Sequence, residues 1–186
     1  MNSTIVATRE VTLTDLDDPD RLLVEAAQRA ARNAYAPYSG FAVGVAVRTR
    51  KGNLYTGANM ENAAYGVTMC GEAAGLTAAN SAGDFDVEAM AVVGRKFIEP
   101  VGDDLVVSPC GRCRQLICEA GQISHTDVRL LCCNGDLSRI VVAKISELLP
   151  MAFGPANIGL DTIWPALQKQ LHAVIDALAK TRGPAR

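Results

Sequence analysis

Two short segments carry most of the residues that could do chemistry. The first is Cys70-Gly71-Glu72, and the second, about 40 residues later, is Pro109-Cys110-Gly111-Arg112-Cys113. Cys110 and Cys113 are three residues apart, so on a helix their side chains lie on the same face. Together with Cys70 they supply three thiolate ligands. Three protein ligands leave one tetrahedral position open to water, which is typical of a catalytic zinc site and not of a structural one.

Glu72 lies two residues after Cys70, close enough to reach such a water without binding the metal. A carboxylate in that place can take a proton from water and pass it to a leaving amine. Both segments begin predicted helices, whose positive N-terminal ends favour thiolate over thiol. The spacing agrees with the three-cysteine form of the zinc deaminase signature.

The composition favours a globular protein that acts on a small molecule. The chain has 186 residues, of which 49% are hydrophobic and 20% charged, and its net charge of -2 lacks the basic footprint of a protein that grips long nucleic acid. It has neither an apolar run of membrane-spanning length nor a signal peptide pattern. We therefore expect a cytoplasmic protein with no membrane and no nucleic acid polymer as partner. In such a chain, clustered cysteines indicate metal binding or catalysis before disulfides.

Hydrophobic periodicity predicts alternating helices and strands around the two segments. A helix capped by Asp20 should end before Pro37, and two more should cover 70–82 and 110–120. Predicted strands cover 43–47, a stretch from the turn at 51–53 to about 58, 89–94, 128–132 and 140–143. This alternation indicates an α/β layered sandwich. We read Cys118, Cys132 and Cys133 as packing residues.

The chain divides into three predicted parts. Residues 1–18 are polar and read as a loose arm, residues 19–160 form the zinc domain, and residues 161–186 form a C-terminal amphipathic helix and tail. In the last part, apolar residues recur at three- and four-residue spacing, at Trp164, Leu167, Leu171, Val174 and Leu178. We expect this helix to pack on the domain; a role in subunit contacts or in covering the pocket is the alternative.

Four blocks of the sequence resemble the small homotetrameric cytidine deaminases, in the same order along the chain. The blocks are APYSGFAVG at 36–44, GANMENAAYG at 57–66, SPCGRCRQ at 108–115 and LLPMAFGP at 148–155. The resemblance implies a three-layer αβα sandwich around a mixed five-stranded sheet. It also implies Zn²⁺ held by Cys70, Cys110 and Cys113, Glu72 as the proton shuttle, and a homotetramer with shared active sites. The implied reaction converts cytidine and deoxycytidine to uridine and deoxyuridine in pyrimidine salvage.

The same resemblance assigns the residues of a pyrimidine nucleoside pocket. Asn59 and Glu61 would bind the ribose 3′-hydroxyl, and residues two apart at a strand end face one side. The other assigned residues are Phe41 in the base pocket, Phe153 stacked on the pyrimidine from a neighbouring subunit, and Ala63 and Tyr65 reaching across the interface. Arg114 and Gln115 are expected to make structural hydrogen bonds.

The sequence departs from the family pattern directly after the first ligand. Relatives with three cysteine ligands read Cys-Ala-Glu-Arg, whereas residues 70–73 read Cys-Gly-Glu-Ala. Three thiolates and Zn²⁺ sum to -1, and the missing arginine would draw off part of that charge. We hypothesise that Arg112 bonds a ligand thiolate and restores the balance. Blasticidin S deaminases also lack the first arginine and share the Gly-Arg-Cys-Arg of residues 111–114.

Three alternatives remain at this point. The substrate could be a modified cytosine nucleoside such as blasticidin S, or one with a larger N4 substituent, because Gly71 and Ala73 are small and would widen the pocket. A catalytically silent zinc module is opposed by Glu72, because a structural site needs no proton shuttle. A polynucleotide editor is opposed by the acidic balance and by the ribose-binding pair, since a strand needs an open 3′ side.

Overall fold

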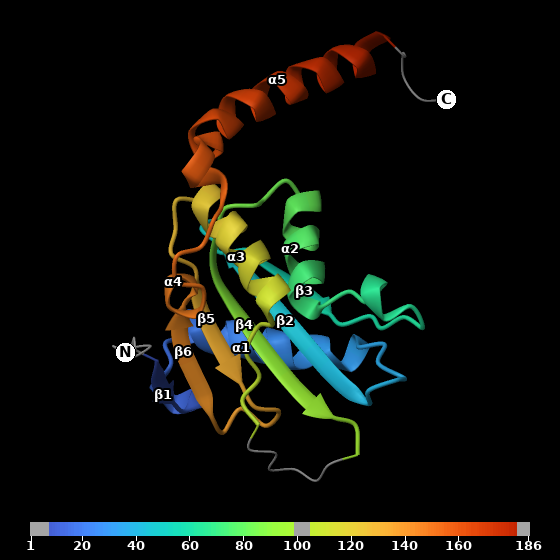
Figure 1. Ribbon diagram of the computed structural model, residues 1–186, viewed down its shortest axis with the longest axis vertical. Coiled ribbons are helices and arrows are strands. Elements are labelled where there is room, and N and C mark those ends of the chain that lie inside the picture. The colour runs from blue at the N-terminus through green and yellow to red at the C-terminus, as the bar shows by residue number, and fades with distance from the viewer. Residues whose placement is uncertain (1–7, 99–104, 182–186) are drawn as a thin grey trace.

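One mixed sheet of six strands forms the centre of the protein. The computed structural model describes residues 8–98 and 105–181, and the strand order is β1-β6-β5-β4-β2-β3. Strands β4 and β5 run parallel, and the other neighbouring pairs are antiparallel (Figure 1). The strands are β1 Arg9–Val11, β2 Phe41–Thr49, β3 Leu54–Ala58, β4 Val87–Lys96, β5 Arg129–Cys133 and β6 Ile140–Lys144.

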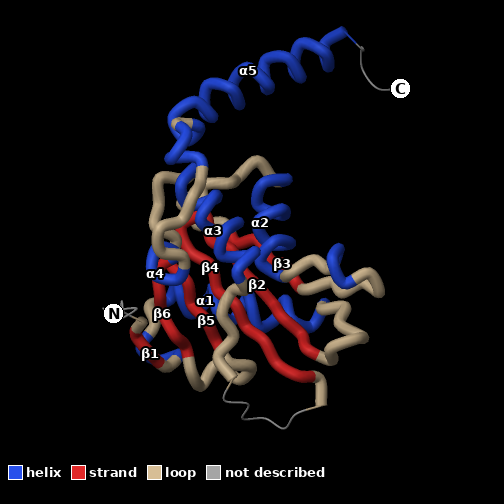
Figure 2. Tube along the Cα trace, viewed as in Figure 1, coloured by secondary structure: helices blue, strands red, loops and turns tan. Residues whose placement is uncertain are grey.

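Helices cover both faces of this sheet (Figure 2). The α-helices of the described chain are α1 Asp18–Ala30, α2 Gly71–Ser81, α3 Gly111–Ile123, α4 Ile145–Leu148 and α5 Leu160–Thr181, of which α1 covers one face and α2 and α3 cover the other. Alternate residues of β2 face opposite layers: Ala46 joins the core cluster beneath α1, whereas Val45 and Val47 join the cluster beneath α2 and α3. The predicted three-layer αβα sandwich is therefore confirmed.

The sheet has one strand more than the five predicted. β1 pairs with β6 at the edge, with Arg9 opposite Val142 and Val11 opposite Ile140. Residues 9–11 of the predicted loose arm thus belong to the sheet, while residues 1–7 lie outside the described part. A strand of three residues with one buried side chain, Val11, is too short for its alternation to be recognised.

Helix α1 begins two residues before the predicted cap. Asp17 is the N-cap, and its carboxylate accepts the Asp20 backbone N–H at 2.9 Å. Asp20 itself is buried and pairs with Arg48 of β2 at 2.9 Å and Arg129 of β5 at 2.8 Å. An acidic residue near a helix start fits both roles, so the sequence alone did not separate a cap from an ion pair that ties α1 to the sheet.

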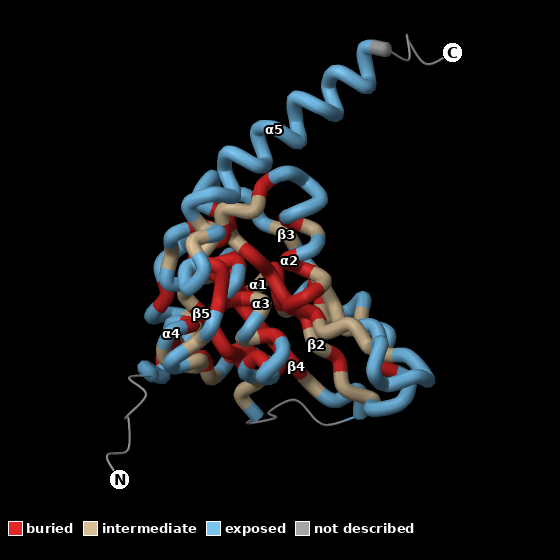
Figure 3. Tube along the Cα trace, turned by 45° about the horizontal axis from the view of Figure 1, so that its top comes forward, coloured by how far each residue is buried: buried red, intermediate tan, exposed pale blue. Residues whose placement is uncertain are grey.

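The prediction that the C-terminal helix packs on the domain is wrong for most of its length. Helix α5 contacts α3 and the 3-10 helix Pro155–Ile158, and then extends away from the sheet layers with its whole surface exposed (Figure 3). Its apolar residues are at helical spacing, but no element of the described chain faces their distal part. In the described residues, no helix combines the length and the hydropathy that crossing a bilayer requires.

Gly57 of β3 lets α2 lie directly against the sheet. A Cβ atom at Gly57 would be 2.3 Å from the backbone N of Gly75 and 2.4 Å from the carbonyl O of Gly71. Gly71 in turn faces β2, because a Cβ there would be 3.0 Å from Cγ2 of Val45. The helix that follows the first cysteine segment is therefore seated by backbone-to-backbone contact.

We predict that Gly57→Ala destabilises the protein by about 1–3 kcal/mol, because the added methyl group overlaps the α2 backbone. Urea unfolding followed by circular dichroism measures the loss. Gly66→Ala is the matched control, since a Cβ atom there would meet nothing within 4 Å. Equal stability of the two variants would contradict the close seating of α2.

Candidate active site

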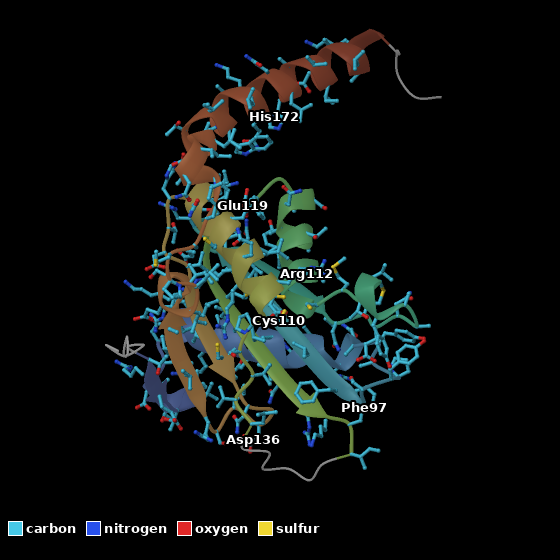
Figure 4. All side chains as sticks on the ribbon, viewed as in Figure 1. Phe97, Cys110, Arg112, Glu119, Asp136 and His172 are labelled. Atoms are coloured by element: carbon cyan, nitrogen blue, oxygen red, sulfur yellow. The ribbon has the colours of Figure 1, made fainter. Side chains whose placement is uncertain are left out.

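The three predicted cysteine ligands come together where two helices begin. Cys70 is the N-cap of α2, Cys110 is the N-cap of α3, and Cys113 lies in the first turn of α3. Their Sγ atoms all lie within 4.8 Å of one another. Helices α2 and α3 share one face of the sheet, and Figure 4 shows Cys110 at the start of α3. The arrangement of these helices therefore builds the cluster.

The electrostatics of this cluster call for a cation. Burial raises the pKa of the Cys70 and Cys113 thiols, and the charge of the Glu72 carboxylate raises both further. Burial also opposes ionisation of Cys110, but hydrogen bonds from the Cys113 backbone N–H and the neighbouring thiols lower its pKa overall. Three thiolates beside a carboxylate repel one another unless a dication joins them. Three sulfur ligands fit Zn²⁺.

Glu72 lies beside the cysteine cluster without being part of it. It is in the first turn of α2 and only 4% exposed, and its negative charge opposes ionisation of each of the three thiols, although the pKa of Cys110 is lowered overall. The positive N-terminal end of α2 favours a carboxylate there. The fold therefore places a buried carboxyl side chain next to the three sulfur atoms.

The segment around Asn59 and Glu61 is fastened to the first ligand segment through the backbone. Met60 and Met69 exchange two backbone hydrogen bonds of 2.9 Å each, and Met69 directly precedes Cys70. On the other side, the Glu61 N–H donates to the Tyr35 carbonyl at 2.7 Å. These bonds hold the predicted ribose-binding residues at a fixed place relative to Cys70.

The Asn59 side chain points toward the start of β2. Its Oδ1 accepts the Val43 N–H and its Nδ2 donates to the Phe41 carbonyl, both at 2.9 Å. The Phe41 ring is half-buried and fills space that Gly94 leaves open, since a Cβ at Gly94 would be 2.8 Å from Cε1 of Phe41. Asn59 therefore positions Phe41, the residue predicted to line the base pocket.

Glu61 points toward the same stretch of chain as Asn59, as the alternation predicts. Its Oε2 accepts the backbone N–H groups of Tyr38 at 2.9 Å and Ser39 at 3.2 Å. The Ser39 side chain and these two N–H groups hold the pKa of Glu61 below its usual value, although partial desolvation opposes them. The carboxylate is therefore ionised at neutral pH and able to accept a hydrogen bond from a sugar hydroxyl.

The three residues predicted at a subunit interface are exposed in the single chain. Tyr65 is 74% exposed and meets Tyr38 edge-to-face with ring centroids 6.0 Å apart, and Ala63 is exposed beside it. Phe153 is 66% exposed, while its carbonyl accepts a hydrogen bond from Gln115 Nε2 at 2.8 Å. The single chain thus leaves these side chains uncovered.

Arg112 makes a different contact from the one hypothesised. Its guanidinium donates to the Thr68 carbonyl at 3.2 Å, and among the described residues no hydrogen bond joins it to a ligand sulfur. Figure 4 shows Arg112 next to Cys110 at the start of α3. Arg112 therefore braces the chain two residues before Cys70.

The small size of Gly71 has a different role from the predicted one of widening the pocket. Gly71 points at β2 (its absent Cβ faces Val45), so its small size serves helix packing and does not widen a substrate pocket. Thr68, Met69 and Gly94 also build the site, although no motif in the sequence points to them. Thr68 and Met69 act through backbone atoms, which residue type does not reveal.

The remaining predictions about cysteines and hydrogen bonds are confirmed. Cys118 and Cys132 pack in the core beneath α2 and α3, and Cys133 packs beneath α1. Burial, with a small contribution from Glu72, raises the pKa of Cys132 to about 12 although the Arg114 charge opposes it. Arg114 donates to the carbonyls of Pro109 at 2.9 Å and of Leu148 at 3.0 Å, which fixes the loop before α3.

Comparison with known proteins agrees with this geometry. Residues 17–128 match the family model described as the cytidine and deoxycytidylate deaminase zinc-binding region. Cytidine deaminase of Halalkalibacterium halodurans is 42% identical over 133 residues, which cover 72% of this chain and 92% of that protein. The crystal structure of cytidine deaminase from Burkholderia pseudomallei superposes with a TM-score of 0.61 at 39% identity and covers 71% of this chain and 97% of that one.

A second solved structure gives the same result. Cytidine deaminase from Mycobacterium tuberculosis has a TM-score of 0.57 at 38% identity, and the alignment covers 74% of this chain and 99% of that one. The matched family region contains both cysteine segments and Glu72. The sulfur cluster, the buried carboxylate and these similarities together establish that the chain belongs to the cytidine and deoxycytidylate deaminase family.

Proposed function

We propose that this protein hydrolyses cytidine and deoxycytidine to uridine and deoxyuridine and releases ammonia. The observation that carries the proposal is the buried Glu72 carboxylate beside three cysteine sulfur atoms that lie within 4.8 Å of one another. A structural zinc site needs no proton acceptor, whereas hydrolysis of an amine from a pyrimidine ring needs one. The polynucleotide-editor and silent-module alternatives find no comparable support.

The residues of the site would divide the reaction between them. Zn²⁺ held by Cys70, Cys110 and Cys113 would supply Lewis acidity that lowers the pKa of water. Glu72 would accept a proton as the water oxygen bonds to C4 of the pyrimidine, and would donate it to the exocyclic nitrogen as the C4–N bond breaks. One water is consumed and one ammonia released, so Glu72 returns to its starting charge.

The nucleoside would be held by the segments fastened around this centre. Glu61 is an ionised acceptor and Asn59 an amide next to it, which suits a ribose hydroxyl that both donates and accepts. Phe41 would contact the base from the start of β2. Because Asn59 bonds the backbone on both sides of Ala42, the sugar-binding and base-binding residues would keep a fixed separation.

A homotetramer with shared active sites would cover the exposed residues of the pocket. Ala63, Tyr65 and Phe153 are exposed in the single chain, and each would meet a neighbouring subunit, with Phe153 stacked on the pyrimidine. Covering these large aromatic side chains would remove apolar area from water, which stabilises an interface. The cytoplasm, where thiols stay reduced, is the compartment in which such a zinc site would persist.

The proton shuttle is tested with a substrate panel. Wild-type protein should deaminate cytidine and deoxycytidine, and Glu72→Gln should lower kcat by about 10²–10⁴-fold, the usual contribution of a positioned acid–base group. Absorbance of the pyrimidine follows the reaction, and bound zinc, measured by atomic absorption, should be unchanged. Turnover of blasticidin S or of N4-substituted cytidines alone would contradict the proposed substrate, and equal rates of both proteins would exclude Glu72 as the shuttle.

The ligand assignment is tested by counting zinc. We expect one zinc per chain in the wild-type protein and a loss of most of it in Cys113→Ser, because the hydroxyl does not ionise at neutral pH. Cys118→Ser is the matched control, since Cys118 is also buried on α3 but lies in the core. A chelator competition titration gives the affinities, and equal zinc retention by both variants would refute the assignment.

Arg112 is proposed to balance the negative charge of the three thiolates through space. Arg112→Ala should lower kcat about tenfold, which corresponds to a one-unit rise in the pKa of the attacking water. Arg112→Lys keeps the charge and should restore most of the turnover. The matched control is Arg29→Ala on α1, which removes a similarly exposed arginine far from the site in the fold. Unchanged turnover of Arg112→Ala would refute the charge-balancing role. If Arg112→Lys does not restore turnover, the role of Arg112 is limited to its hydrogen bond with the Thr68 carbonyl.

A further inference from the structure

The distal helix α5 carries an apolar surface that the single chain leaves uncovered. Six large apolar side chains on it are 39–56% exposed. They follow one another at alternating spacings of four and three residues, which is the a and d pattern of a coiled coil. The six residues are Leu160, Trp164, Leu167, Leu171, Val174 and Leu178.

The residues beside this seam also fit a helix partner. Ile163 and Ile175 flank the seam and widen the apolar stripe to an arc of roughly 120°. Gln168 and Gln170 flank the centre of the seam, so no charge stands beside its centre. The charged side chains of the distal half lie on the opposite face of the helix.

A helix of this kind needs a covering partner to be stable. α5 has 22 residues, and in proteins most of the stability of a helix comes from tertiary packing of its apolar face. Two such stripes would bury on the order of 1,400 Å² when they meet, which falls within the roughly 1,200–2,000 Å² of stable protein interfaces.

The charges of α5 argue against a lipid surface as the partner. The helix carries Asp161 and Asp176 against Lys169 and Lys180, so its polar face is electrically balanced. Helices that lie on membranes have polar faces rich in lysine and arginine. A two-fold symmetric contact places the same surface on both sides, so this surface must not repel itself. When a second copy of the helix packs on the seam, no like charges face each other across it.

A groove at the base of α5 sets the direction of the pairing. A cavity of about 670 Å³ lies between the first turns of α5 and the C-terminal ends of α2 and α3, with Phe85, Ile123 and Trp164 among its lining residues. Leu160 and Leu167 line the groove and also belong to the seam, so the seam continues into a groove whose lining is partly apolar and partly charged. Only an antiparallel partner helix would bring its distal end into this groove.

We propose that α5 pairs in antiparallel orientation with α5 of a second copy of this chain. The seam then places Trp164 opposite Val174 of the partner subunit and Leu160 opposite Leu178 of the partner subunit. Each groove receives the distal end of the other helix. The contact is reciprocal, so it buries both stripes at once.

Disulfide trapping tests the partner and the direction together. In the full chain, Trp164→Cys combined with Val174→Cys should give, under mild oxidation, a reducible species of twice the chain mass of 19.7 kDa. The two positions are ten residues apart, about 15 Å along one helix, so they do not bridge within a chain. Trp164→Cys with Ala173→Cys is the matched control, because Ala173 lies on the outer face.

The outcomes separate the arrangements. At least tenfold more trapped dimer in the Val174 pair than in the Ala173 pair supports the proposal. Trapping by Val174→Cys alone indicates a parallel pairing and overturns it. Equal trapping in the two pairs, or no trapping above the wild-type cysteines, overturns it as well.

Fluorescence gives a second reading without cysteine substitutions. Trp164 is the only tryptophan, and the second copy should bury it. Val174→Glu should shift its emission to longer wavelength and increase acrylamide quenching, whereas Ala173→Glu should leave both as in the wild type. Identical spectra for all three proteins would overturn the pairing. Cytidine turnover and zinc content of the same variants report on the proposed function separately, because neither position belongs to the candidate active site.

Discussion

The structure depends on two helices that begin side by side on one face of the sheet. The starts of α2 and α3 bring three sulfur atoms from two distant chain segments within 4.8 Å of one another. Backbone contact fixes the position of α2 on the sheet, because any side chain at position 57 would overlap the backbone of Gly71. Metal affinity in this protein is therefore partly a packing property of strand β3, even though that strand supplies no ligand.

Charge explains why the two helix starts are suited to this task. Burial makes ionisation of Cys70 and Cys113 unfavourable, and Glu72 adds a negative charge in the same place. The positive ends of two helices offset part of this repulsion, and a dication offsets the rest. Glu72 lies in the first turn of α2 with only 4% exposure, and the positive end of that helix favours a negative charge there.

The sequence predicted the residues of the candidate site more completely than the outer elements of the fold. Residue types and spacing identified the sulfur cluster and Glu72, because ligand geometry constrains both strongly. Periodicity found the five longer strands and the layered fold. It missed β1, whose pairing with β6 depends on a partner more than 120 residues away, and it did not show that α5 leaves the domain. An amphipathic pattern indicates that a face is covered, but it does not identify what covers it. The hydrogen bond from Arg112 to the Thr68 carbonyl could not be predicted either, because residue type does not indicate which backbone carbonyl a side chain meets.

The backbone pairing of Met60 with Met69 has a mechanical consequence. Those two hydrogen bonds make the segment around Asn59 and Glu61 move as one body with the segment that carries Cys70. Substitutions that displace one of these segments will therefore also displace the other. Because the Asn59 amide also bonds the backbone of Phe41 and Val43, a displacement of either segment is passed on to the start of β2 as well.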